Sequence, residues 1–181
     1  MRIASVTRGG KIMQELKEYR EAIEFLAEKQ EDFAYDNKGA NHAVIVLVNM
    51  LKNTKNEFLM FSGTFNSDVA DKKEFIEELQ NYIESGKIFK LVLEENVNTK
   101  SEALQLIEKL KKENKNIKII NAKEIFIEEL KRIFDNDVLH FSVSDEKSYR
   151  LEVGKNEFKA VCNFNDPEIA KELKRLINLN F

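Results

Sequence analysis

The sequence predicts an α/β domain built on a mixed, mostly parallel sheet with helices on both faces. It adds an extra helix near the N-terminus and an antiparallel meander at the C-terminus. Two observations lead to this class. Between residues 41 and 134, short apolar runs alternate with amphipathic stretches, a pattern typical of βαβ units. After Asp135, short alternating segments follow one another with only turns between them, which is typical of antiparallel strands.

The composition is that of a globular protein. Of the 181 residues, 43% are hydrophobic and 34% are charged, which excludes a disordered chain. Cys162 is the only cysteine, so neither an internal disulfide nor a metal site made of thiols can form. We expect no metal and no cofactor. The longest apolar run, near residues 43–48, is too short to cross a bilayer, and no secretion signal is visible. We therefore expect a cytoplasmic protein with no membrane partner.

The charge balance argues against a protein that coats nucleic acid. The chain carries 29 basic and 32 acidic residues, a net charge of -3, whereas such proteins usually have a basic excess. The most basic stretch, residues 109–118, is interrupted by Glu113, which favours a solvated helix end over a nucleic-acid patch. The charge balance does not exclude a small local site that binds an anion, and a phosphate-containing ligand or nucleic acid stays an alternative partner.

The N-terminal part is expected to be an extension followed by a helix. Residues 1–12 lack an amphipathic pattern, and one hypothesis is that translation begins naturally at Met13. Residues 14–30 have apolar side chains at helical spacing. We take residues 1–38 as this N-terminal extension and helix, and residues 39–181 as the α/β domain.

The central part is expected to alternate helices with strands. The spacing predicts helices over residues 41–53, 71–84, 101–113 and 123–134, and strands over 57–62, 87–93 and 117–120. Thr99 or Ser101 would cap the third of these helices. The turn at residues 62–64, Ser-Gly-Thr, follows a buried strand at the carboxyl end, where parallel sheets commonly place ligand loops; a plain turn is the alternative.

The C-terminal part is expected to be a meander and a final helix. Alternation predicts strands over residues 138–144, 148–153 and 158–164. The last helix would have Asp166 as N-cap and Pro167 at its first position, where the missing N–H has no consequence.

The meander carries a resemblance to a known family. Residues 139–147, Leu-His-Phe-Ser-Val-Ser-Asp-Glu-Lys, resemble the HKD motif of the phospholipase D superfamily, His-x-Lys-x4-Asp. Residues 160–165 stand where the family usually carries Gly-Ser-x-Asn, and a helix follows as in many members. The resemblance covers about residues 40–181. It implies a phospholipase D-like fold, a homodimer and a bacterial setting in regulation or defence.

Two registers of the motif are open. If His140 is the motif histidine, Ser142 replaces the lysine and Lys147 replaces the aspartate. If Asp145 is the motif aspartate, His140 takes the place of the lysine and Val138 that of the histidine. We favour the second, because it aligns the turn Asp-Glu-Lys with the family's Asp-Gly-Lys.

The chemistry of the family depends on residues that this chain lacks. In the family reaction one histidine attacks phosphorus, a second protonates the leaving oxygen, and lysines hold the nonbridging oxygens. Valine cannot act as the nucleophile, so we assign no catalytic residue, although His140 is a candidate. The leading hypothesis is a non-catalytic phospholipase D-like domain, a pseudoenzyme, that binds a phosphate-containing ligand or a protein partner. The alternatives are an active phosphodiesterase or nuclease centred on His140, and a pure interaction module.

The candidate ligand-binding residues are polar side chains of the meander: His140, Asp145, Arg150, Glu152, Asn163 and Asn165. Each also has a structural interpretation. A lone histidine on a strand is often a hydrogen-bonded structural residue, and aspartate is common in tight turns because it caps backbone N–H groups.

The remaining four candidates form two pairs, each sharing one face of a strand. Arg150 and Glu152 form either an ion pair or a site in which Arg150 replaces the phosphate-holding lysine. If the resemblance holds, Asn163 lines the pocket; otherwise Asn163 and Asn165 are polar edge residues.

Overall fold

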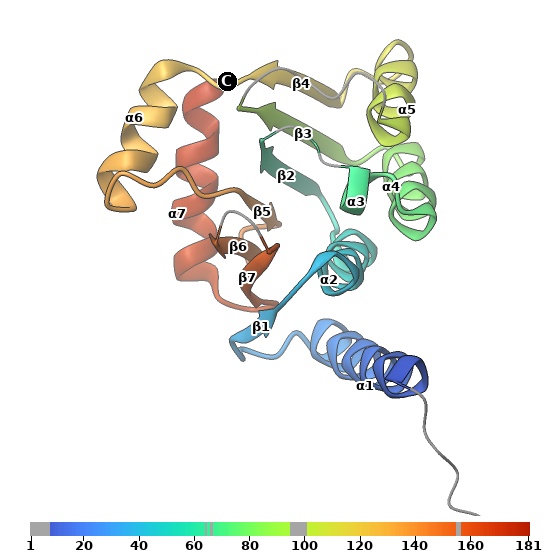
Figure 1. Ribbon diagram of the computed structural model, residues 1–181. Helices are drawn as coiled ribbons and strands as arrows, with labels where there is room; N and C mark the ends of the chain where they lie inside the picture. The colour runs from blue at the N-terminus through green and yellow to red at the C-terminus, as the bar shows by residue number, and fades with distance from the viewer. Residues whose placement is uncertain (1–7, 64, 66, 95–100, 155–156) are drawn as a thin grey trace, which may run out of the picture.

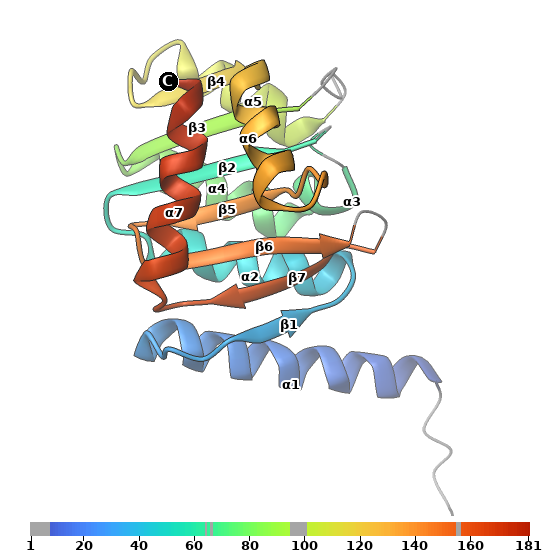
Figure 2. The ribbon, with the colours of Figure 1, turned by 90° about the vertical axis from the view of Figure 1, so that its left-hand side faces the viewer.

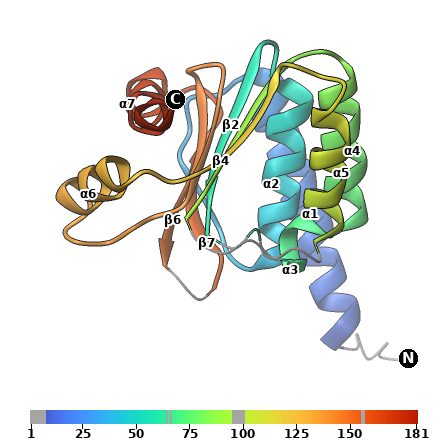
Figure 3. The same ribbon diagram turned by 90° about the horizontal axis from the view of Figure 1, so that it is seen from above.

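A mixed β-sheet lies between two layers of helices (Figures 1 and 3). The computed structural model describes residues 8–63, 65, 67–94, 101–154 and 157–181. Within these residues seven strands form one sheet in the order β1-β7-β6-β5-β2-β3-β4. The strands are β1 (Tyr35–Asn37), β2 (Glu57–Ser62), β3 (Ile88–Leu93), β4 (Ile117–Asn121), β5 (Phe141–Ser144), β6 (Ser148–Gly154) and β7 (Lys159–Asn163).

The pairing of the strands confirms the predicted α/β class. Strands β2, β3 and β4 are parallel, and β5, β6 and β7 form the predicted antiparallel meander beside β2. Strand β1 extends the meander by pairing antiparallel with β7. The sheet is therefore mixed as expected but not mostly parallel, because β1 and the meander together make antiparallel pairs outnumber parallel ones.

The helices divide between the two faces of the sheet (Figure 3). Helices α2 to α5 cover one face, α1 lies beside α2 at the β1 edge, and α6 and α7 cover the other face. Their bounds are α1 (Arg8–Lys29), α2 (Ala40–Asn53), α3 (Ser67–Ala70), α4 (Lys73–Glu84), α5 (Glu102–Lys111), α6 (Glu124–Ile133) and α7 (Pro167–Ile177), followed by the 3-10 turn η1 (Asn178–Asn180).

Each face of the sheet has its own hydrophobic core, and β2 contributes to both. Phe58 and Met60 point into the core beneath α2 and α4, while Leu59 and Phe61 point into the core beneath α6 and α7. This explains why β2 is a continuous apolar run in the sequence, since a strand covered on both faces needs apolar side chains at successive positions.

The predicted helix ends are largely confirmed. The Ser101 hydroxyl accepts a hydrogen bond from the Leu104 N–H, and the Asp166 carboxylate accepts one from the Ile169 N–H, with Pro167 at the first helical position. Thr99, the alternative cap, lies outside the described residues.

Several boundaries or elements differ from the sequence-based expectation. Helix α1 begins at Arg8 rather than at residue 14, so part of the expected extension is helical. Strand β1 and helix α3 were not predicted, because three or four residues are too few to show a period. Strand β5 begins at Phe141 rather than at residue 138, and Val138 packs in the core beneath α6 and α7 from outside the strand. Helix α4 begins at Lys73, and Asp71 instead accepts hydrogen bonds from Ser101 Oγ and the Ala103 N–H, which fixes the start of α5.

The N-terminal helix lies along the edge of the molecule, beside α2 and β1 (Figure 2). It begins at Arg8, and residues 1–7 lie outside the described part, so a natural start at Met13 stays a prediction. The division between residues 38 and 39 also stays a prediction, although β1 lies before it and joins the sheet. None of the helices in the described part is long and apolar enough to span a membrane.

Candidate functional site

A small cavity lies between the sheet and the layer formed by α2 and α3. Its volume is about 60 Å³, room for a few water molecules. The helix side is apolar and includes Ala43, Leu47 and Phe65, whereas the sheet side carries polar groups from β2, from the start of β5 and from β6. The polar side is formed by Ser62, His140, Ser142, Arg150 and Glu152.

The His140 imidazole bridges two carboxylates at the edge of this cavity. Its Nε2 lies 2.7 Å from Glu94 Oε2, and its Nδ1 lies 3.2 Å from Glu152 Oε2. The ring packs edge-on against Phe61, with 5.2 Å between the ring centroids. Gly63 makes this position available, because a Cβ there would lie 2.8 Å from His140 Cε1.

The two carboxylates favour the charged form of His140. Burial alone would lower its pKa, but the hydrogen bonds to Glu152 and Glu94 outweigh burial and raise the pKa above its ordinary value. Burial would likewise raise the pKa of Glu152, but His140 and Arg150 outweigh it and lower that pKa. With a carboxylate at each ring nitrogen, the arrangement suits an imidazolium that donates both of its N–H groups.

Arg150 is buried, and each of its three guanidinium nitrogens donates a hydrogen bond within the protein. Its side chain is 5% exposed. Nε donates to Asn37 Oδ1 at 2.8 Å, Nη1 to Glu152 Oε1 at 2.9 Å, and Nη2 to the Phe158 carbonyl at 3.2 Å. The ion pair expected between Arg150 and Glu152 is thus present, and Arg150 also ties β6 to β1.

Asp145 lies at the other end of β5, away from His140. Its carboxylate accepts hydrogen bonds from the backbone N–H groups of Lys55, Asn56 and Glu57, at 2.9 Å for Asn56 and 3.0 Å for Glu57. The residue has a φ of 49°, a left-handed conformation that aspartate tolerates in tight turns. These contacts match the structural interpretation of Asp145.

Asn163 and Asn165 also lie outside the cavity lining. Asn163 Nδ2 donates to Asp32 Oδ1 at 2.9 Å, and Asn163 Oδ1 accepts from the Asn165 N–H at 2.9 Å. The structure therefore brings three of the six candidate residues together and places the other three toward the opposite end of the meander.

Two partners in the site were not predicted from the sequence. Glu94 belongs to no motif, but it directly follows β3, and its backbone N–H donates to the Ser62 carbonyl. The parallel pairing of β2 with β3 would have placed it beside the turn after β2. Asn37 comes from β1, which showed no sequence signal. Thr64 of the predicted ligand turn lies outside the described residues.

No group of three or more His, Cys, Asp or Glu side chains in the described ranges is arranged to hold a metal ion. Each nitrogen of His140 faces a different carboxylate instead. The groups of this site can therefore exchange protons and form hydrogen bonds with one another.

Comparison with known proteins identifies the fold. No protein-family model matches the sequence, and no curated protein matches it significantly. Among solved structures, the chain resembles TrmBL2, an archaeal chromatin protein whose structure shows a novel mode of DNA binding, with a TM-score of 0.59 and 17% identity. The match covers 93% of this chain and 63% of that chain, so this chain spans less than two thirds of the chromatin protein.

Two further solved structures are similar to this chain in fold. Nuc from Salmonella typhimurium, a phospholipase D family member, matches with a TM-score of 0.55 and 13% identity over 82% of this chain and 94% of that chain. Phosphatidylserine synthase from Haemophilus influenzae matches with a TM-score of 0.51 and 11% identity over 80% and 37%. The expected phospholipase D-like fold is confirmed over most of the chain, and these identities establish the fold alone.

Proposed function

We propose that this chain is a non-catalytic domain of the phospholipase D fold that acts by binding. The observation that carries the proposal is the bridge in which His140 lies between Glu94 and Glu152. An imidazolium has no lone pair, so it cannot attack phosphorus. A carboxylate on Nε2 also repels a phosphodiester from the one nitrogen that could otherwise react.

The favoured register of the motif supports the same conclusion. It places Val138 where the family carries its nucleophile, and the Val138 side chain is buried in the core beneath α6 and α7. In that register His140 stands in place of the lysine, where it holds carboxylates rather than phosphate oxygens.

Of the two kinds of binding partner, a protein partner is favoured over a phosphate-containing ligand. A phosphate needs free donors and a positive site, but each guanidinium nitrogen of Arg150 already donates a hydrogen bond, to Asn37, Glu152 or Phe158. The two positive groups, His140 and Arg150, are offset by the two carboxylates beside them. The fold is shared with a DNA-binding chromatin protein, but a net charge of -3 does not favour DNA as the partner of this chain.

One observation favours an active phosphodiesterase as the second candidate. Glu152 holds Nδ1 of His140, as a carboxylate does when it orients a catalytic histidine. Activity would then require Glu94 to leave Nε2, so the two candidates differ in the role of a single carboxylate.

Hydrolysis of bis-p-nitrophenyl phosphate and of single-stranded DNA separates these candidates. We expect no turnover by the wild type, by His140→Ala or by the exposed control Glu77→Gln on α4. Wild-type turnover that His140→Ala abolishes and Glu77→Gln retains would defeat the proposal. Turnover that appears only in Glu94→Gln would support it, because Glu94 would then be the group that blocks an otherwise oriented histidine.

A further inference from the structure

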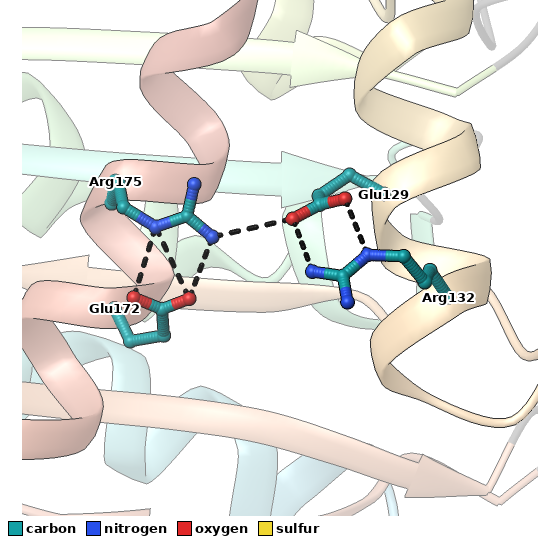
Figure 4. Close-up of polar contacts among 4 residues, drawn as sticks. All are labelled: Glu129, Arg132, Glu172 and Arg175. Atoms are coloured by element: carbon teal, nitrogen blue, oxygen red, sulfur yellow. Dashed lines mark hydrogen bonds and ion pairs between the residues drawn. The ribbon is translucent and has the colours of Figure 1, made fainter.

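The outer surface of α6 and α7 carries a row of charges of alternating sign (Figure 4). Glu172 accepts a hydrogen bond from Arg175 at 2.7 Å, Arg175 reaches across to Glu129 on α6 at 3.4 Å, and Glu129 accepts from Arg132 at 2.7 Å. From α7 to α6 the row therefore runs negative, positive, negative, positive. Elsewhere, the exposed pair Lys73–Glu77 lies within α4, and Arg20–Glu74 joins α1 to α4.

An alternating row with an even number of charges is complementary to its own two-fold image. If a two-fold axis crosses the row between Arg175 and Glu129, it reverses the order of the charges in a second copy. Each charge then lies opposite one of the other sign: Glu172 opposite Arg132, and Arg175 opposite Glu129. A self-complementary patch of this kind is what a two-fold dimer interface requires.

Apolar side chains accompany the row. Ile125, Ile133 and Ile169 are 59%, 36% and 40% exposed. On α6, Ile125 and Ile133 lie four residues before and after Glu129, which places them on the same side of the helix. On α7, Ile169 lies three residues before Glu172. Exposed isoleucines beside paired charges provide apolar area that a second copy would bury.

We propose that this α6–α7 surface binds the same surface of a second copy of the chain about a two-fold axis. The surface lies on the side of the sheet opposite to the cavity at His140 (Figure 3). The inference therefore goes beyond the proposed function and can fail independently of it.

Charge reversal tests this interface on the full chain by sedimentation at low salt. At about 100 μM, an interface with a Kd near 1 μM is largely paired, so we expect a dimer. Glu172→Arg and Arg132→Glu each place like charges opposite one another twice per dimer, so each should weaken dimerisation by at least about tenfold. Ile125→Glu should weaken it as well, and the control Glu77→Arg on α4 should not.

A mixture of the two reversed chains gives the sharpest result. With Glu172→Arg in one chain and Arg132→Glu in the other, positions 172 and 132 again carry opposite charges, and the unchanged Arg132 faces the unchanged Glu172. We expect the mixture to form heterodimers although each variant alone is largely monomeric. A monomeric wild type, a dimer that survives both reversals, or a mixture that stays monomeric would each overturn the proposal. Circular dichroism checks that the variants fold, as expected for exposed positions.

Discussion

At the scale of single residues, antiparallel pairing separates side chains that are close in the sequence. His140 and Asp145 flank β5, which pairs antiparallel with β2, so His140 lies near Phe61 at one end of β2 and Asp145 near Glu57 at the other. Only His140 belongs to the cavity. Asp145 joins the turn after β5 to the start of β2 through backbone N–H groups.

Replacing Asp145 tests this structural role. Asp145→Ala removes the acceptor of three backbone N–H groups, and we expect it to lower the free energy of unfolding by about 1–3 kcal/mol. Asp145→Asn keeps one neutral acceptor, so it should lower the free energy of unfolding by less than Asp145→Ala does. Urea unfolding measures both. An unchanged stability in Asp145→Ala would contradict the assigned role.

Contacts in the site could be predicted from the sequence only where the two residues are close together in the chain. Arg150 and Glu152 could be paired from the sequence, because side chains two residues apart on a strand share a face. Glu94 and His140 come together only because β3 and β5 both pair with β2, and no local pattern contains that information. The same limit applies to Asn37, which reaches Arg150 from the opposite end of the chain.

At the scale of elements, α1 is held to the rest of the molecule by a short list of contacts. Ile23 and Ala27 are buried against the core beneath α2. Tyr19 stacks on His42, with ring centroids 3.8 Å apart, and Arg20 forms an ion pair with Glu74 on α4. The amphipathic spacing in the sequence predicted this helix, but not which element it would cover.

Two alanine substitutions on α1 compare the contribution of its buried face to stability with that of its exposed face. Ile23 is 2% exposed and Phe25 is 55% exposed. We expect Ile23→Ala to lower the free energy of unfolding by about 2–4 kcal/mol and to speed amide hydrogen exchange in α1. Phe25→Ala should change stability by less than about 0.5 kcal/mol. Equal effects of the two substitutions would show that α1 is not docked on this face.

At the scale of the whole molecule, the His140 bridge joins three strands of the sheet. Glu94 follows β3, His140 precedes β5 and Glu152 lies in β6. The alternation of helices and strands predicted the layers of this fold, and the meander predicted its antiparallel half. The order of the strands was not predictable, because it depends on which edge of β2 accepts the meander.

The bridge has a defined dependence on pH. The raised pKa of His140 means that its stabilisation is fully present below the ordinary value of about 6.5 and is lost as pH rises through the folded-state value. The lowered pKa of Glu152 means that its contribution is present above about 4.5 and is lost as pH falls through the folded-state value. The complete bridge therefore stabilises the fold most between these two ordinary values.

The claim that His140 is a bridging imidazolium is tested most directly by an NMR titration of the histidine rings. The chain has two histidines, and His42, whose pKa is lowered by burial, serves as the internal reference. We predict that His140 titrates above about 6.5 with both ring nitrogens protonated at pH 6, and that Glu94→Gln lowers its pKa. A His140 that titrates at or below that value, with a free lone pair on Nε2 at neutral pH, would contradict the account, because that is the state a nucleophile needs.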